Sequence, residues 1–451
     1  MNTSVPMITI GDLVEQKEAK IQTGPFGTQL KASEYVDCGI PVINVRNVGF
    51  GDIRDADLEF ITNAKAEKLN AHRLQKGDIV FGRKGAVERH ALIGAKQDGW
   101  VQGSDCLRLR LNGTTICGRY ASYYLRTRAH QDWMQALCSF GATMASLNHD
   151  IVKRIAIPLP SRTTQRKIAA ILTAYDDLIE VNKRRIALLE KMAEELYREW
   201  FVRLRFPGYQ DTRFVKGVPE GWPFDVGAVF FDHIKGKSYA SHEISDEDGA
   251  CFFITLKSFH RRGGYRKEGL KYFSGSYKEG QCVEAGDVVM AVTDMTQDRA
   301  VVGEVARIPN LYGKKAVISL DVIRLMPKKM STTFLYSYMR YSGFANYIKE
   351  FANGANVLHL KPDLIGKQKL LFPPADLRDK FSNLVEPFYQ EIDALEEANG
   401  VLTKTRDLLL PRLISGKLSV EDLDIQFPPS MQEDTPAAPA EQEASPETRY
   451  A

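Results

Sequence analysis

The segment QRKIAAILTAYDDLIEVNKRRIALLEKMAEELYREWF, residues 165–201, carries a repeat of seven residues that continues for about five heptads. Every seventh residue forms the expected seam of a coiled coil: Ile168, Tyr175, Asn182, Leu189 and Leu196. A second stripe is expected three or four positions further on: Leu172, Leu178, Ile186, Met192 and Trp200. Charged residues such as those of NKRR, residues 182–185, lie between the stripes. The pattern predicts a long helix that packs against another helix.

A second segment near the C-terminus repeats the same pattern. Its expected seam is Phe381, Phe388, Leu395, Leu402 and Leu409. Its second stripe is expected to be Leu384, Ile392, Ala398 and Leu413. A helix of about 38 residues is roughly 57 Å long. Asn182 falls on the seam, where a buried polar side chain fixes the register of a helix pair at some cost in stability.

The segments that precede the two helices are related by an internal duplication. KGDIVF at 76–81 matches AGDVVM at 285–290, and INVRNV at 43–48 matches ITLKSF at 254–259. GATMASLNHD at 141–150 matches GANVLHLKPD at 354–363. These matches keep their order, and their offsets vary only between 209 and 213 residues. We infer that the chain contains two copies of one unit, each a globular part followed by a long helix.

Each globular part mixes strands and helices. Runs such as IPVINVRNV and CLRLRL favour strands, whereas the segments around 120–137 and 333–351 have helical spacing. We therefore predict an α+β fold with five segments: a first globular domain at 1–160, a central helical region at 161–205, a second domain at 206–375, a distal helical region at 376–423 and a disordered tail at 424–451. The tail is predicted to be disordered because it is rich in Pro, Ala and Glu.

Composition and charge set wide limits on the function. The chain has 44% hydrophobic and 26% charged residues and a formal net charge of +3. Six acidic residues and one basic residue in 424–451 leave +8 on the remainder, a modest excess that suits contact with phosphates. The sequence has neither a secretory signal nor an apolar run long enough to cross a membrane, so we expect a cytoplasmic protein. The six cysteines form no CxxC pair, so we expect reduced thiols and no metal site.

We find no catalytic motif in the sequence. GKS at 236–238 lacks the first glycine of a phosphate-binding loop, because residue 231 is Phe. GxSxG, HExxH and GxGxxG do not occur, and the two Pro-Pro pairs, in FPPA and FPPS, lack the Asn/Asp-Pro-Pro-aromatic pattern of an adenine methyltransferase. The chain is therefore expected to have no catalytic residues.

Candidate nucleic-acid contacts occur in equivalent places of both copies. GRKGAVERH follows the first KGD strand, AVTDMTQDRA follows its counterpart, and HRRGGYRK adds a basic and aromatic segment to the second copy. Arg, Asn and Gln can form paired hydrogen bonds with base edges, while Lys more often meets phosphate. The candidate DNA-binding residues are Arg46, Asn47, Arg83, Lys84, Arg89, Lys257, Arg261, Arg262, Tyr265, Thr293, Asp294, Gln297 and Arg299. Because the two loops differ in composition, we predict an asymmetric target in two parts, with the helices setting the gap between them.

Several of these segments together resemble the specificity subunits of type I restriction–modification systems. The resemblance rests on GDIVFGRKG, GATMASLNHDIVKRIAIPLP, the heptad segment quoted first, TLKSFHRRGGY, VTDMTQDRA and LLLPRLISGKL, and it extends over about residues 5–423. It implies two target-recognition domains and two long helices that pair antiparallel as a coiled coil.

The resemblance also implies which partners the chain has. These are double-stranded DNA, two methyltransferase (modification) subunits and ATP-dependent restriction subunits. S-adenosylmethionine, ATP and magnesium would be held by those partners, so no cofactor is expected on this chain. Two alternatives from other classes are a free-standing DNA-binding or architectural protein, which would bind its site tightly alone, and a nuclease or methyltransferase, which would show turnover alone.

Overall fold

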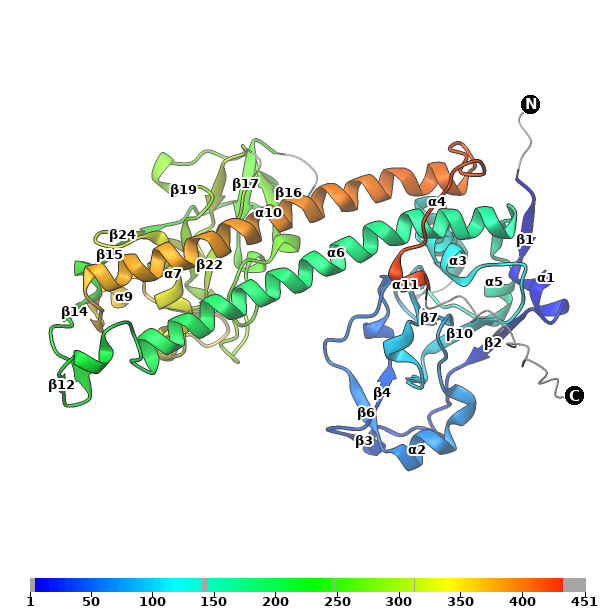
Figure 1. Ribbon diagram of the computed structural model, residues 1–451, viewed down its shortest axis with the longest axis horizontal. Helices are drawn as coiled ribbons and strands as arrows, with labels where there is room; N and C mark the ends of the chain where they lie inside the picture. The colour runs from blue at the N-terminus through cyan, green and yellow to red at the C-terminus, as the bar shows by residue number, and fades with distance from the viewer. Residues whose placement is uncertain (1–4, 140–144, 247–248, 312, 433–451) are drawn as a thin grey trace, which may run out of the picture. The chain divides into compact units, whose positions relative to one another are not determined.

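The computed structural model describes residues 5–139, 145–246, 249–311 and 313–432. Its chain divides into two compact units: residues 1–180 with 401–451 form unit 1, and residues 181–400 form unit 2. Each unit contains strands, short helices and parts of two long helices, α6 (Arg162–Tyr197) and α10 (Ala375–Ile414) (Figure 1). The fold is thus the predicted α+β class. Both long helices contribute to both units, because α6 changes unit after Glu180 and α10 after Gly400.

Unit 1 is built on two sheets and a short strand pair. One sheet has the order β2-β10-β7-β8-β5, the other β3-β6-β4-β9, and β1 pairs with β11. The strands are β1 (Met7–Thr9), β2 (Ala19–Thr23), β3 (Tyr35–Val36), β4 (Ile40–Ile43), β5 (Phe50–Gly51), β6 (Glu59–Ile61), β7 (Ile79–Gly82), β8 (His90–Leu92), β9 (Val101–Gln102), β10 (Cys106–Leu111) and β11 (Ala156–Pro158). The α-helices besides α6 and α10 are α1 (Ile10–Glu15), α2 (Asn63–Lys68), α3 (Gly118–Leu125), α4 (Arg128–Ser139), α5 (His149–Lys153) and α11 (Pro429–Gln432).

Unit 2 repeats this plan. The order β15-β24-β20-β22 corresponds to β2-β10-β7-β8, and β16-β18-β17-β23 corresponds to β3-β6-β4-β9. The strands are β12 (Phe214–Val215), β13 (Val218–Pro219), β14 (Phe224–Val226), β15 (Phe231–Lys235), β16 (Ile244–Ser245), β17 (Cys251–Ile254), β18 (Lys271–Phe273), β19 (Cys282–Val283), β20 (Val288–Ala291), β21 (Thr293–Asp294), β22 (Val305–Arg307), β23 (Ala316–Ile318), β24 (Val322–Pro327), β25 (Leu358–His359) and β26 (Lys369–Leu371). The short helices are α7 (Thr332–Tyr341), α8 (Phe344–Ile348) and α9 (Asp363–Lys367).

The strand directions also repeat. β4 and β9 are parallel, as are their counterparts β17 and β23, while β7–β8, β7–β10, β20–β22 and β20–β24 are antiparallel. A parallel pair needs a long crossover and does not arise from a local hairpin. Two copies that share this arrangement therefore support the duplication inferred from the sequence.

One arginine–aspartate pair holds the same position in each unit. Arg108 of β10 donates to the carbonyl oxygen of Arg73 at 2.7 Å, and its Nε lies 4.0 Å from the carboxylate of Asp78. The carboxylate of Asp78 also accepts a hydrogen bond from the Gln75 amide at 2.8 Å. These side chains fasten the turn before β7 to the neighbouring strand β10.

The same bonds recur in unit 2. Arg324 of β24 donates to the carbonyl oxygen of Cys282 at 3.0 Å and to Asp287 at 2.8 Å, and Asp287 accepts from the Glu284 amide at 2.7 Å. The aspartates belong to the KGD and AGD motifs. These motifs are therefore part of the framework of the fold.

The two long helices lie side by side and antiparallel within each unit (Figure 1). In unit 1, Arg406 of α10 donates to Asp176 of α6 at 2.6 Å. In unit 2, Asn182 donates to Asn399 at 2.9 Å, and Arg185 pairs with Glu391 at 2.7 Å. Contacts move toward the N-terminus of α10 as they advance along α6, as they must in an antiparallel pair. The predicted coiled coil is confirmed.

The first seam stripe agrees with the packing, whereas the second was partly wrong. Ile168, Phe381 and Leu395 are buried; the other residues of the first stripe, Tyr175, Asn182, Leu189, Leu196, Phe388, Leu402 and Leu409, are partly buried. In the second stripe, Leu178, Met192 and Leu384 are about half exposed. The residues that follow them, Ile179, Ala193 and Val385, are buried in their place. The second stripe therefore also advances by strict sevens, and the prediction failed because at these positions it chose the first of two adjacent apolar residues and abandoned constant spacing.

The ends of the helical regions differ from the predicted boundaries. α6 continues into a π-helical turn, Arg198–Val202, and the aromatic rings of Trp200 and Phe201 pack edge-on against Phe381. α10 ends at Ile414, well before the predicted limit at 423. Gly416 follows with φ of 72°, a conformation that favours glycine and terminates helices.

The start of the predicted disordered tail is folded. Met431 of α11 is buried in the core of unit 1, and Ile425 and Phe427 pack against that core. The Ser430 hydroxyl donates to Asp177 of α6 at 2.7 Å, and Arg166 lies over the Phe427 ring at 4.8 Å. The prediction of disorder was thus wrong for 424–432, because three apolar residues, Ile425, Phe427 and Met431, suffice to anchor the segment. Residues 433–451 lie outside the described residues.

No helix in the described part of the chain is long and apolar enough to cross a membrane.

Candidate nucleic-acid interface

The first candidate loop follows β7 and is held by the segment that carries the GATMASLNHD motif. Arg83 and Lys84 begin the loop. The Gly85 amide donates to the carbonyl oxygen of Ala145 at 3.1 Å, and the Leu147 amide donates to that of Arg83 at 2.8 Å. These backbone bonds explain why the two motifs recur together in both copies, although 140–144 lie outside the described residues.

The equivalent loop of unit 2 is held in the same way. Its first residues form β21, which pairs with β25 of the GANVLHLKPD motif, and the Gln297 side chain donates to the carbonyl oxygen of Ala355 at 3.1 Å. Asp294 organises the loop by accepting from the amides of Val301 and Thr296 at 2.7 and 3.0 Å. Burial raises the pKa of Asp294, but these hydrogen bonds outweigh burial and lower it overall, so the carboxylate is ionised at neutral pH.

Several predicted contact residues are exposed and carry only weak internal bonds. Lys84 is 58% exposed and lies 3.3 Å from Asp105, while Arg261 is 74% exposed and lies 3.6 Å from Asp298. Arg46 pairs with Glu59 at 3.0 Å, and Arg299 pairs with Glu350. Lys257, Arg262 and Gln297 are also exposed. Exposed ion pairs of this kind contribute little to stability, so these cations could exchange a carboxylate for a phosphate at small cost.

Other predicted contact residues are not available to a ligand. Asn47 is fully buried: its Nδ2 donates to the carbonyl oxygens of Arg54 and Ala56, and its Oδ1 accepts from the Asn44 amide. Thr293 and Asp294 are 3% exposed. Burial gives these three residues a structural role, and polar side chains that shape a turn have the same composition as polar side chains that contact bases.

Tyr265, Arg83 and Arg89 occupy intermediate positions. The hydroxyl of Tyr265 is buried, and burial raises its pKa, with Glu396 and Glu268 adding to the effect. Arg83 and Arg89 are partly buried and each has a buried Nε without a hydrogen-bond partner, while the Arg89 guanidinium lies 5.4 Å from the centre of the Phe50 ring. Their buried ends fix these side chains to the domain surface.

The sequence interpretation missed Arg126 of unit 1 and its counterpart Arg340 of unit 2. A Cβ added to Gly51 would lie 2.1 Å from Nε of Arg126, and one added to Gly264 would lie 2.8 Å from Nη1 of Arg340, so a side chain at either position would displace the arginine. Both glycines also have positive φ. The offset of 214 residues between the arginines was the signal that could have revealed them.

Arg126 also joins the domain of unit 1 to its helices. Arg126 donates to Oδ2 of Asp176 at 2.8 Å and Arg406 donates to Oδ1 at 2.6 Å, while the Tyr123 hydroxyl donates to Oδ2 at 2.7 Å. Burial raises the pKa of Asp176, but the two arginines and the hydrogen bonds lower it further, so the net shift is downward. Asp176 is thus an ion-pair centre rather than part of a solvated face.

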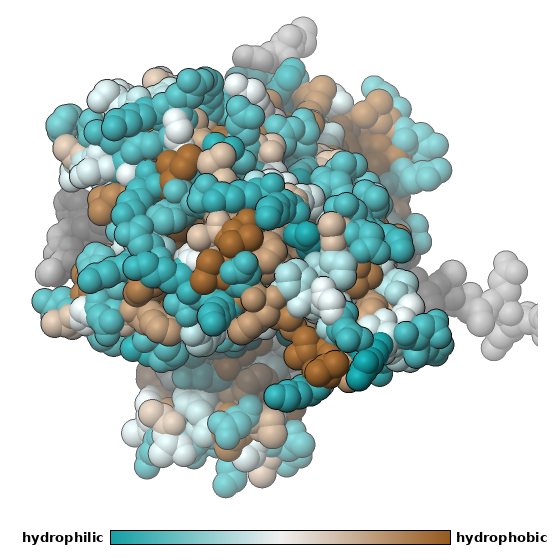
Figure 2. All heavy atoms as spheres, turned by 90° about the vertical axis from the view of Figure 1, so that its left-hand side faces the viewer, coloured by the Kyte–Doolittle hydropathy of each residue, from teal (hydrophilic) through white to brown (hydrophobic). Residues whose placement is uncertain are grey.

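The molecular face shown in Figure 2 is mainly hydrophilic, and its hydrophobic residues occur as separate groups. Among the described residues, no group of three or more His, Cys, Asp or Glu side chains is placed to hold a metal ion.

Comparison with known proteins shows what this chain is similar to. The family model of the type I restriction modification DNA specificity domain matches residues 4–191. The MjaIX specificity subunit of Methanocaldococcus jannaschii is 28% identical over 340 residues, covering 68% of this chain and 71% of that protein. The HindI specificity subunit of Haemophilus influenzae is 20% identical and covers 76% of this chain and 87% of that protein.

A solved structure shows the same fold. The type I restriction–modification S subunit from M. genitalium superposes with a TM-score of 0.54 at 17% identity, covering 92% of this chain and 97% of that one. The chain is therefore similar to type I restriction–modification specificity subunits, through the domain model over residues 4–191 and through curated relatives over most of its length.

Proposed function

We propose that this chain selects the DNA target of a type I restriction–modification complex, with each unit recognising one part of an asymmetric, two-part sequence. The observation that carries the proposal is a shared framework with different loops. Arg108–Asp78 and Arg324–Asp287 are equivalent, and the loops that follow β7 and β20 are anchored alike. The exposed side chains differ, with Lys84 in one loop and Gln297 in the other. Recognition of two different base sequences requires different hydrogen-bond donors, and the two units carry them on equivalent loops.

Two modification subunits and the restriction subunits are the proposed protein partners, and the long helices are their proposed docking surface. Large apolar residues on these helices remain exposed: Leu178, Val401 and Leu408 in unit 1, and Val181, Leu188 and Met192 in unit 2. Exposed apolar groups on paired helices favour contact with another protein. We assign S-adenosylmethionine, ATP and magnesium to these partners, which leaves recognition to this chain.

The test replaces the basic residues of one candidate segment at a time. R83A/K84A and R261A/R262A are assembled with the modification subunits, and binding is measured on the target and on targets with one half scrambled. Each variant is expected to lose discrimination of one half only. K68A/K96A, which removes two exposed lysines outside the loops of unit 1, is the matched control. If each loop variant weakened binding to all DNA equally, the loops would contact phosphate and the assignment of base recognition would fail.

A further inference from the structure

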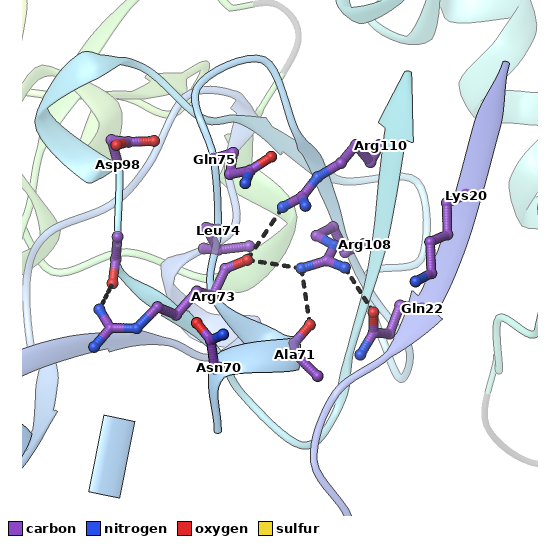
Figure 3. Close-up of a pocket in the computed structure, with 11 residues that line it drawn as sticks. Lys20, Gln22, Asn70, Ala71, Arg73, Leu74, Gln75, Asp98, Arg108 and Arg110 are labelled. Carbon is purple, nitrogen blue, oxygen red and sulfur yellow. Dashed lines mark hydrogen bonds between the residues drawn. The ribbon is translucent and has the colours of Figure 1, made fainter. Parts of the chain in front are cut away.

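Unit 1 contains an open pocket of about 430 Å³ between β2, β10 and residues 70–75 (Figure 3). Four basic side chains line it, and Asp98 is its acidic lining residue. The basic residues are Lys20, Arg73, Arg108 and Arg110. The first candidate loop, which begins at Arg83, leaves the opposite end of β7, so this strand of four residues separates the pocket from the loop.

Two of the arginines are held rigidly by the protein. Arg108 is buried and donates to the carbonyl oxygens of Ala71 and Arg73 and to Oε1 of Gln22. Arg110 donates from two nitrogens to the carboxylate of Asp78, each at 2.7 Å. Asp78 is therefore shared by two guanidinium groups and balances only one of their charges.

The surplus of positive charge affects neighbouring groups. Burial lowers the pKa of Arg108, and the charge of Arg110 lowers it further. Burial, followed by the charge of Arg108, also lowers the pKa of His72. Burial is the larger cause of both shifts, and the second cause in each case is the charge of a neighbouring arginine; the pKa of Arg110 itself is raised, chiefly by its hydrogen bonds with Asp78.

The fold does not require this charge, as unit 2 shows. Strand register places Lys20 opposite Arg110 in unit 1, and Asp232 opposite Met326 at the equivalent position of unit 2. Arg73, which supplies the carbonyl oxygen to Arg108, is replaced by Cys282. Unit 2 keeps the pair of Arg324 with Asp287 and lacks the other three cations. The additional cations of unit 1 therefore serve something other than folding.

The lining offers donors suited to an oxyanion. Lys20 is exposed at one edge of the pocket, and Asn70 and Gln75 are exposed at the opposite side, with Arg108 between them and Lys20 (Figure 3). Arg73 uses Nη1 to bond the carbonyl oxygen of Gly99, which orients its planar guanidinium. A compact ammonium beside fixed guanidinium groups is the donor set that binds phosphate in proteins.

We propose that this pocket binds a phosphate group, supplied either by the backbone of the recognised DNA or by a free phosphate ion. The first source rests on the proposed function. A strand of four residues is about 13 Å long, which is close to the roughly 12 Å width of the major groove. The first candidate loop could therefore lie at the base edges in the major groove while the pocket lies over the phosphate backbone that borders the groove.

The test uses K20D and R110M, which install the residues of unit 2. Met326 shows that the fold accepts the second change, and Lys20 is exposed. K17D is the control, because Lys17 is an exposed lysine on the turn before β2 and does not line the pocket. The affinity of the full chain for target and unrelated DNA is measured as a function of salt, and its thermal stability in sodium phosphate is compared with that in sodium chloride at equal ionic strength.

If DNA is the source, K20D and R110M each weaken binding to both DNAs and reduce the slope of log affinity against log salt by about 0.9, the effect of one lost phosphate contact. If the source is a free ion, DNA binding is unchanged and the stabilisation by phosphate disappears. Wild-type values in both measurements would overturn the pocket assignment. Absence of any target preference in the wild type would instead overturn the proposed function.

Discussion

Asn182 donates a hydrogen bond from Nδ2 to Oδ1 of Asn399, and the two atoms are 2.9 Å apart. Both residues occupy heptad positions of the paired helices, so two amides face each other where apolar residues would pack better. Such pairs specify one register at a cost in stability.

Asn182→Leu is therefore expected to lower the free energy of unfolding of unit 2 by about 1–2 kcal/mol, because Asn399 loses its partner. The double variant N182L/N399L should be at least as stable as the wild type. Urea unfolding of the full chain measures the free energy of unfolding of the single and the double variant. A single variant as stable as the double variant would show that the amide pair contributes nothing.

Asp176→Asn tests the ion-pair centre of unit 1. The substitution leaves Arg126 and Arg406 without their shared carboxylate, and we expect a loss of about 2 kcal/mol. The control is D132N, since Asp132 pairs with Arg128 on an exposed helical turn, where such pairs contribute about 0.3–0.5 kcal/mol. Denaturant unfolding at neutral pH compares the two, and equal losses would contradict the role of Asp176.

Two buried histidines predict acid sensitivity of unit 1. Burial lowers the pKa of His130 to about 4, and burial, Arg126 and His130 lower the pKa of His90 well below its usual range. Because the unfolded chain binds these protons near pH 6.5, stability is complete above about pH 6.5 and falls toward pH 4 by up to about 1.4 kcal/mol per pH unit and histidine. His130→Phe keeps a ring between Tyr124 and Trp133 and should flatten this dependence. If the free energy of unfolding of His130→Phe depended on pH as steeply as that of the wild type, His130 would not be a source of the acid sensitivity.

The folded start of the tail predicts different outcomes for two truncations. Removal of 433–451 should leave the stability of unit 1 unchanged. Removal of 424–451 exposes the surface that Met431 and Phe427 cover, and Met431→Ala alone should cost about 2–3 kcal/mol. Thermal unfolding of the three variants distinguishes these cases. Equal stability of the two truncations would show that α11 contributes nothing.

The proposed spacing function predicts the effect of removing one heptad from each long helix. Deletion of 179–185 together with 396–402 keeps the seam pattern on both helices, because these segments pair. The helices shorten by about 10 Å, equal to roughly three base pairs at about 3.4 Å each. Mapping of methylated sites should show a shorter gap and unchanged half-sites. An unchanged gap would contradict the spacing function.

The duplication and the long helices could be predicted because they depend on patterns repeated over long distances. Matches such as KGDIVF with AGDVVM fix an alignment that chance rarely produces, and heptads add the same signal at each turn. The second stripe failed where two apolar residues are adjacent: Leu178 precedes Ile179, and hydrophobicity alone does not show which of them points inward.

The candidate contacts were predicted less well, because the type of a side chain does not show what it bonds to. Asn47 and Asp294 look like base-contacting groups and instead hold their own turns. The basic pocket of unit 1 could not be predicted from the sequence, because Lys20, Arg73 and Arg110 are far apart along the chain. They come together only when the strands pair.

The two largest apolar clusters among the described residues draw their members from one unit each. Damage to one hydrophobic core should consequently leave the other domain native. A mutant with one destabilised domain would then lose sequence discrimination in one half of its target. It would still require the correct bases in the other half. In a cell, such a lesion would broaden the set of modified sites before it abolished modification.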